Sequence, residues 1–347
     1  MTNGTEEVAK EMSTIEASGL MRALLMRKLL LGIALPATAL CAIAVPASAG
    51  EIPRIGVLLH QAMASSADAG LRDGLREQGY VDGQNIVTEW RPSGGSVEDA
   101  RPHAAELVRS KTDLILALTT SAARAAMEAT STTPIVFVSA DPVATGLAES
   151  LAKPGANATG VSVASPELAA KRLDLLHQLA PQARRIAFLV NPSNASIAPQ
   201  FAQAQNAARE LGIRLERFDA RNAAEIDVSL RAIQRSAPDA MLIASDLGLL
   251  LEKARIASAV RKARIQAVFP WKEYHEHGAL MSYGPDLEAV MRRTASYVGK
   301  ILRGVKPRDL PVEEISKFDL VIDLRVAREL RIEVPQSLLL RADEVIR

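Results

Sequence analysis

The chain has 347 residues, of which 48% are hydrophobic and 23% are charged, so it is long enough for two globular domains with ordinary cores. Its 41 Lys and Arg nearly balance its 40 Asp and Glu. Nucleic-acid-binding proteins usually carry a basic excess, so this balance argues against a nucleic acid as partner.

The N-terminal segment has the order of a secretory signal peptide. A basic cluster at Arg22, Arg27 and Lys28 precedes the uncharged apolar run Leu29 to Val45, and the small-residue site Ala47-Ser48-Ala49 follows it. These are the three parts that direct export and cleavage. We therefore predict a signal peptide over residues 1–49, and a mature protein that is exported to the periplasm.

Two further interpretations concern the same segment. The apolar run could remain in the membrane as an anchor, but Pro36 interrupts it and its length lies at the lower limit for a bilayer span. Residues 1–20 are rich in glutamate, unlike the start of a signal peptide, so we expect translation to begin at Met21 or Met26.

Cys41 is the only cysteine of the chain. Lipidated bacterial proteins carry an acylated cysteine just after a short apolar segment, with a small residue before it. Leu40 precedes Cys41 and fits that pattern poorly, so we do not expect a lipid anchor there. Cleavage after Ala49 would leave the mature protein without thiol or disulfide chemistry.

From residue 54 onward, short apolar runs alternate with segments of helical spacing. In the first series the predicted strands are Arg54 to Leu59, Asn85 to Arg91, Asp113 to Leu118 and Pro134 to Ser139. The predicted helices between them are Ser66 to Gly79, Val97 to Ser110 and Thr120 to Thr130.

A second series of the same kind begins at residue 185. Its predicted strands are Arg185 to Val190, Ile213 to Phe218, Ala240 to Ala244 and Ala267 to Pro270. Its predicted helices are Ala198 to Leu211, Ala223 to Arg235 and Leu250 to Lys262. Continuous apolar strands that alternate with helices are typical of parallel sheets covered on both faces, so the sequence predicts an α/β protein with two doubly wound parallel-sheet lobes.

Proline and glycine mark the points where the chain is expected to cross between the lobes. These points are Ser162 to Pro166, Tyr283-Gly284-Pro285 and Lys306 to Pro311. We therefore assign residues 50–163 plus about 284–312 to lobe 1, and about 164–283 plus about 313–347 to lobe 2.

Polar residues follow most of the predicted strands. Ligands of open parallel sheets bind outside the carboxyl ends of the strands, and two facing lobes would bring these ends to one cleft. The candidate ligand-binding residues are therefore His60, Gln61, Thr119, Thr120, Ser121, Ser139, Asp141, Asn191, Ser193, Asn194, Asp246, Trp271 and Tyr274.

Several of these residues also have a purely local interpretation. The hydroxyls of Thr119 to Ser121 could attract a carboxylate at a helix start, or could only cap the helix. Asp141 and Asp246 could each receive a ligand ammonium, although Asp141 before Pro142 also suits a helix cap. The loop Asn191 to Asn194 could bind a ligand, or only its own backbone.

Aromatic residues make up only 3% of the chain, so their positions carry information. Trp271 and Tyr274 could cover an apolar or ring-bearing ligand, or pack in the core. The run His275-Glu276-His277 invites a metal site, but residues two apart on a helix point in different directions, so we expect a solvated helix end. The sequence has no phosphate-binding loop, dinucleotide fingerprint or nucleophile elbow, so we predict no catalytic residue and no cofactor.

Several segments, in order along the mature chain, resemble one protein family. They are Asp141-Pro142-Val143, Gly146-Leu147, Ser150-Leu151-Ala152, Lys153-Pro154-Gly155, Asn157 with Thr159-Gly160, Pro270 to Tyr274, Gly278 to Pro285, Lys317 to Ile322 and Ala342 to Val345. This pattern resembles the ABC transporter substrate-binding family that includes tryptophan- and tyrosine-type binding proteins. Many relatives have an Asp-Pro-Leu-Phe-like turn where this chain has Asp246-Leu247-Gly248-Leu249, without the proline and the ring.

The resemblance implies a type I periplasmic-binding-protein fold, in which three hinge strands join the lobes and the ligand lies between them. It also implies an ABC permease and its ATPase as partners, and no enzymatic activity. We expect a monomer that binds a small molecule, and an amino acid or similar zwitterion suits the candidate residues. The alternatives are an exported enzyme on the same scaffold, or a ligand-sensing regulator core, which would need a DNA-binding motif where this chain has a signal peptide.

Overall fold

The computed structural model describes residues 52–163 and 165–347. The predicted signal peptide, Cys41 and the two candidate start methionines lie outside the described residues.

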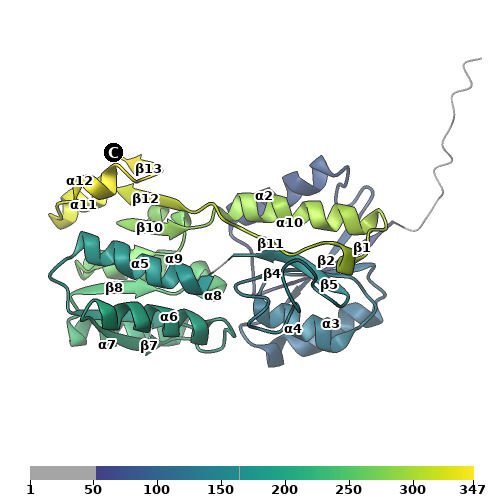
Figure 1. Cartoon of the computed structure of the whole chain (residues 1–347), viewed down its shortest axis with the longest axis horizontal. Coiled ribbons are helices and arrows are strands. Elements are labelled where there is room, and N and C mark those ends of the chain that lie inside the picture. Colours follow the sequence, from purple (N-terminus) through teal and green to yellow (C-terminus); the bar gives the residue numbers. More distant parts are fainter. Residues whose placement is uncertain (1–51, 164) are drawn as a thin grey trace, which may run out of the picture. The chain divides into compact units, whose positions relative to one another are not determined.

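The first sheet of the described chain has six strands in the order β11-β5-β4-β3-β1-β2, and all neighbouring strands in it are parallel. Helices α2 (Ser65–Glu77) and α10 (Leu287–Leu302) cover one face, and α3 (Val97–Arg109) and α4 (Thr120–Ala129) cover the other (Figure 1). The strands are β1 (Arg54–Leu59), β2 (Val87–Pro92), β3 (Leu114–Ala117), β4 (Ile135–Ser139), β5 (Ala158–Ser162) and β11 (Glu313–Glu314).

The second sheet has seven strands in the order β13-β12-β10-β9-β8-β6-β7. The strands are β6 (Arg185–Val190), β7 (Arg214–Asp219), β8 (Ala240–Ile243), β9 (Gln266–Phe269), β10 (Met281–Gly284), β12 (Asp319–Asp323) and β13 (Glu344–Ile346). The helices of this part are α5 (Ser165–Leu179), α6 (Ile197–Glu210), α7 (Ala223–Ser236), α8 (Leu247–Leu251), α9 (Lys253–Lys262), α11 (Leu324–Leu330) and α12 (Gln336–Leu339).

The α/β architecture with two parallel sheets is confirmed, with one difference. Strands β10 and β12 pair antiparallel, so this edge of the second sheet is mixed. The predicted helix Leu250 to Lys262 is also wrong as a single element, because α8 ends at Leu251 and α9 begins at Lys253. Asp246 caps the short α8, and the chain turns at Glu252 before α9.

The chain passes between the two sheets three times: after β5, after β10 and after β11. The passage after β10 begins at Pro285, the last residue of the predicted break Tyr283-Gly284-Pro285, while Tyr283 and Gly284 still belong to β10 and pair with β12. The third passage lies between Glu314 and Asp319, a few residues after the predicted break Lys306 to Pro311, because Glu313 and Glu314 still pair with β5 of the first sheet. Within the predicted break the chain forms a short 3₁₀ helix, η2 (Pro307–Asp309). The assignment of whole segments to lobes stays a prediction.

Helices α2 and α10 approach each other closely at two glycines of α2. A Cβ atom on Gly70 would lie 2.2 Å from the carbonyl oxygen of Glu288, and one on Gly74 would lie 2.7 Å from the Cβ of Ala295. Only glycine allows this separation of the two helix backbones. Because α10 directly follows β10 of the second sheet, this contact fixes the second passage against the first sheet.

Candidate functional site

A cavity of about 100 Å³ lies at the carboxyl ends of strands from both sheets. Most of its wall is apolar, and a smaller number of polar side chains from the end of β4 and from the segments after β1, β3, β6 and β8 interrupt it. The apolar side chains include Met63, Leu118, Val138, Leu247, Leu250, Trp271 and Met291. A largely apolar cavity with a few polar groups is the usual form of a small-molecule site.

The structure brings many of the predicted residues together around this cavity. The predicted residues that line it are His60, Thr119, Thr120, Ser121, Ser139, Asn194, Asp246 and Trp271. The others lie outside its lining: Gln61, Asp141, Asn191, Ser193 and Tyr274. The part that each residue has in ligand binding stays a prediction.

The residues outside the lining have identifiable local contacts. Asp141 accepts a hydrogen bond from the backbone N–H of Ala144 at 3.0 Å, which is a turn cap, and Gln61 is exposed. The backbone N–H of Ser193 donates to Asn191 within its own loop. Tyr274 is fully buried, with its ring 4.9 Å from that of Phe269, as expected for core packing.

Asp246 is the acidic group of the cavity, and it is only 3% exposed. One carboxylate oxygen accepts from the backbone N–H of Leu249 at 2.9 Å, and the other accepts from Nδ2 of Asn194 at 2.8 Å. Asn191 lies behind it and donates to both oxygens at 3.2 and 3.3 Å. A carboxylate has about four lone-pair sites, and these four contacts occupy them, so the negative charge is held rigidly at the cavity wall.

The start of α4, which belongs with the first sheet, also lines the cavity. The Thr119 hydroxyl accepts from the backbone N–H of Ala122 at 3.0 Å, so the predicted capping role is present. Thr120 and Ser139 share a hydrogen bond of 3.0 Å between their hydroxyls. The first N–H groups of a helix have no partner within the helix, and the dipole there favours negative charge, so this wall suits a carboxylate.

His60 lines the cavity without a hydrogen-bond partner for either ring nitrogen among the described residues. A Cβ atom on Gly248 would lie 2.7 Å from its Nε2 and 3.0 Å from Oδ1 of Asp246. A side chain at position 248 would push the imidazole of His60 aside, so glycine lets that ring pack against the start of α8. This contact accounts for the glycine in the segment Asp246 to Leu249.

Arg172 and Ser245 were not among the predicted residues. Arg172 projects from α5, is 2% exposed, and donates from both terminal nitrogens to Oγ of Ser245 at 2.8 Å. Burial lowers the pKa of Arg172 to about 9. A sequence signal exists, because Leu168, Arg172 and Leu176 share one face of the helix, so a cation interrupts an otherwise apolar stripe.

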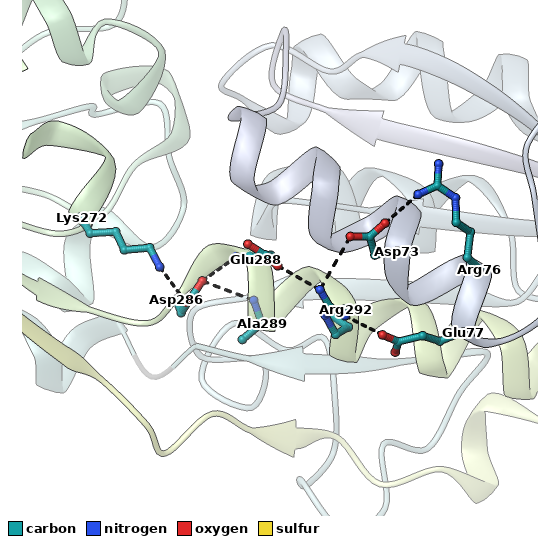
Figure 2. Close-up of polar contacts among 8 residues, drawn as sticks. All are labelled: Asp73, Arg76, Glu77, Lys272, Asp286, Glu288, Ala289 and Arg292. Carbon is teal, nitrogen blue, oxygen red and sulfur yellow. Dashed lines mark hydrogen bonds and ion pairs between the residues drawn. The ribbon is translucent and has the colours of Figure 1, made fainter. Parts of the chain in front are cut away.

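Polar contacts also join the helix η1 (Lys272–His277) to elements beside the first sheet. Nζ of Lys272 donates to Oδ2 of Asp286 at 2.7 Å, and Oδ1 of Asp286 caps α10 through the N–H of Glu288 (Figure 2). Ser66 of α2 donates to Glu273 at 2.6 Å. These bonds join the segment before β10 to α2 and to the start of α10, on either side of the passage after β10.

The model of the ABC transporter substrate-binding protein family matches residues 53–346. The chain belongs to this family.

Three proteins are similar to this chain over most of its length. A tyrosine-binding protein of Clostridioides difficile is 25% identical over 271 residues, which are 78% of this chain and 77% of that protein. A conserved domain protein from Vibrio cholerae is 29% identical with a TM-score of 0.78, over 85% of this chain and all of that one. An ABC domain from Streptococcus pneumoniae in complex with L-Trp is 28% identical with a TM-score of 0.76, over 85% of this chain and 99% of that one.

The substrate-binding family has the type I periplasmic-binding-protein fold that the sequence predicted, and its members bind small molecules outside the cytoplasm. Among the helices of residues 52–163 and 165–347, none has the length and apolar character needed to cross a membrane.

The expectation of a solvated helix end at His275-Glu276-His277 is wrong for the first histidine. His275 is 7% exposed and its Nε2 forms a 2.9 Å hydrogen bond with the hydroxyl of Ser282. The segment forms the 3₁₀ helix η1, which turns His275 toward β10 and leaves His277 half-buried.

Proposed function

We propose that this protein is the exported binding component of an ABC importer, and that it captures an L-amino acid with an apolar or aromatic side chain. The ligand would then pass to a membrane permease driven by its ATPase. We propose further that the protein acts as a monomer and binds its ligand without chemical conversion.

The observation that carries the proposal is the arrangement of charge across the cavity. Asp246, held by Asn191 and Asn194, suits an ammonium group, and the helix start at Thr119 to Ser121 suits a carboxylate. Apolar side chains make up most of the remaining wall and suit an uncharged side chain.

The relatives support this ligand class. One is named for tyrosine, and another was crystallised with L-Trp. Trp271, which is 7% exposed and lines the cavity, offers a flat surface to a ring.

A thermal-shift screen of the purified protein against amino acids, sugars, nucleobases and organic acids tests the proposal. A ligand at 100 times its dissociation constant adds about 2.7 kcal/mol to the stability of the folded state, because it binds that state only. We expect hits among apolar and aromatic L-amino acids, recovered unchanged after incubation. A blank across all amino acids, or conversion of the ligand into a product, would contradict the proposal.

A further inference from the structure

Ser245 lines the cavity just after β8, and Arg172 occupies both acceptor sites of its hydroxyl oxygen. The two terminal nitrogens of Arg172 each donate to its Oγ at 2.8 Å. A hydroxyl has two acceptor lone pairs and one proton, so Ser245 cannot accept from a ligand and can only donate. Among residues 52–163 and 165–347, no hydrogen bond takes up this proton.

Neighbouring hydrogen bonds fix both the side chain of Arg172 and the backbone of Ser245. Nε of Arg172 donates to the carbonyl oxygen of Leu168, one helical turn earlier, which fixes the guanidinium in α5. The side-chain amide of Gln200 bonds both the N–H and the carbonyl of Ser245, at 3.0 and 3.1 Å. These bonds keep the guanidinium of Arg172 against the hydroxyl of Ser245.

The positive charge of Arg172 has no carboxylate partner in the described chain. Within the described chain no carboxylate lies within ion-pair distance of Arg172, although its side chain is 2% exposed. Burying a cation without a partner is unfavourable, and an electron-rich ligand atom bound to the Ser245 hydroxyl would offset part of that penalty.

Ser245 has no counterpart in the amino-acid head group as the proposed function places it. The ammonium has Asp246 and the carboxylate has the start of α4. A fixed donor therefore remains in the cavity wall without a partner on the head group, which leaves the ligand side chain to supply one.

We infer that Arg172 orients Ser245 as a permanent hydrogen-bond donor, and that the ligand side chain presents an oxygen acceptor to it. This inference rests on the proposed function and narrows its ligand class. A phenol oxygen satisfies the donor, a plain phenyl ring leaves it unpaired, and an indole N–H opposes it. Arg172 is a positioning residue, because it acts through Ser245.

The test is titration calorimetry of the full protein with L-tyrosine and L-phenylalanine, which differ by one oxygen. We expect the wild-type protein to bind tyrosine about tenfold more tightly than phenylalanine, and Ser245→Ala to bring the ratio close to one. Ser229→Ala is the matched control, since Ser229 is a buried serine of α7 whose hydroxyl donates to Asp219, and it should leave the ratio unchanged.

Variants of Arg172 separate positioning from a purely structural role. Arg172→Met frees the Ser245 hydroxyl to rotate and should lower the ratio, while Arg172→Lys keeps a donor and should retain part of it. A structural role alone would weaken both amino acids equally. If Arg172→Met does not fold, the Ser245→Ala comparison decides by itself.

The outcomes distinguish this inference from the proposed function. Binding of both amino acids with a ratio near one in the wild-type protein, or a ratio that Ser245→Ala leaves unchanged, would overturn the inference and leave the proposed function standing. Failure of the wild-type protein to bind either amino acid would count against both.

Discussion

Asp246 combines a structural role with the proposed ligand contact. Its side chain caps α8 and accepts from two asparagine amides, so a change to alanine would disturb the wall as well as the charge. Asparagine at this position can keep the cap through one oxygen and most of the shape, but it removes the charge and replaces the oxygen that accepts from Asn194 by a donor.

We therefore predict that Asp246→Asn weakens binding of a zwitterionic amino acid by about 2–5 kcal/mol, through the loss of a desolvated charge partner. Titration calorimetry measures this change. Asp141→Asn is the control, because Asp141 lies outside the cavity lining and should leave the affinity unchanged. Equal affinities of wild type and Asp246→Asn would remove Asp246 from the site.

His275 should make stability depend on pH. Burial lowers its pKa to about 4, whereas an unfolded histidine titrates near 6.5. Between these values the unfolded chain binds a proton that the folded chain does not, so stability falls as the pH drops from about 6.5 toward 4. The full effect is roughly 3 kcal/mol.

His275→Gln can keep the hydrogen bond to Ser282 and should lose this part of the pH dependence. Urea unfolding of both proteins at several values from about pH 7 to about pH 4.5 measures it, and the difference between the two curves cancels the contribution of the carboxylates. Parallel pH profiles would contradict the prediction, because they would show that folding leaves the pKa of His275 unchanged.

The site was predictable where one rule applied. The segments that follow parallel strands gave His60, Asp246 and Trp271, because strand ends converge whatever the details of packing. Arg172 was not predicted because its contact with Ser245 depends on how α5 packs beside the end of β8, and no local sequence pattern shows that packing. The same rule also selected Asp141, which lies outside the cavity lining, because a polar residue after a strand can also cap only its own turn.

At the scale of elements, the contact between α2 and α10 makes a prediction of unusual sign. Alanine normally stabilises a helix relative to glycine by up to about 1 kcal/mol. At Gly70 the added methyl group would meet a backbone oxygen at 2.2 Å, so we predict that Gly70→Ala destabilises the protein by about 1–3 kcal/mol.

Chemical denaturation measures this effect, and Gly299→Ala is the comparison. A Cβ on Gly299 would meet side-chain atoms of Gln78 at 2.8 to 2.9 Å rather than a backbone oxygen at 2.2 Å, so its penalty should be smaller than that of Gly70→Ala. If Gly70→Ala were the more stable variant, the close approach of the two helices would be wrong.

The elements themselves were largely predictable from periodicity. The buried parallel strands read as continuous apolar runs, and RIGVLL and RIAFLV became β1 and β6 with their predicted bounds. The strands β5, β12 and β13 carry weaker signals, since their pairing comes from distant parts of the chain. The antiparallel pairing of β10 and β12 could not be derived from local pattern, because it depends on the direction in which the chain returns after β11.

At the scale of the whole molecule, the cavity lies where residues of both sheets meet, and three chain passages join the sheets. A ligand that contacts both parts binds best when they are close together, and so favours a closed state by its differential affinity. Bonds such as Ser66 to Glu273 would form in that state. The importer role follows if the closed form is the one that the permease recognises.

We propose that this protein binds one amino acid reversibly and does not transform it. Titration calorimetry of the purified wild-type protein with L-tyrosine measures this binding. We predict saturable heat that fits a single site per chain, with the tyrosine recovered chemically unchanged. The absence of saturable heat with tyrosine, and equally with phenylalanine and tryptophan, or the appearance of a product, would contradict it.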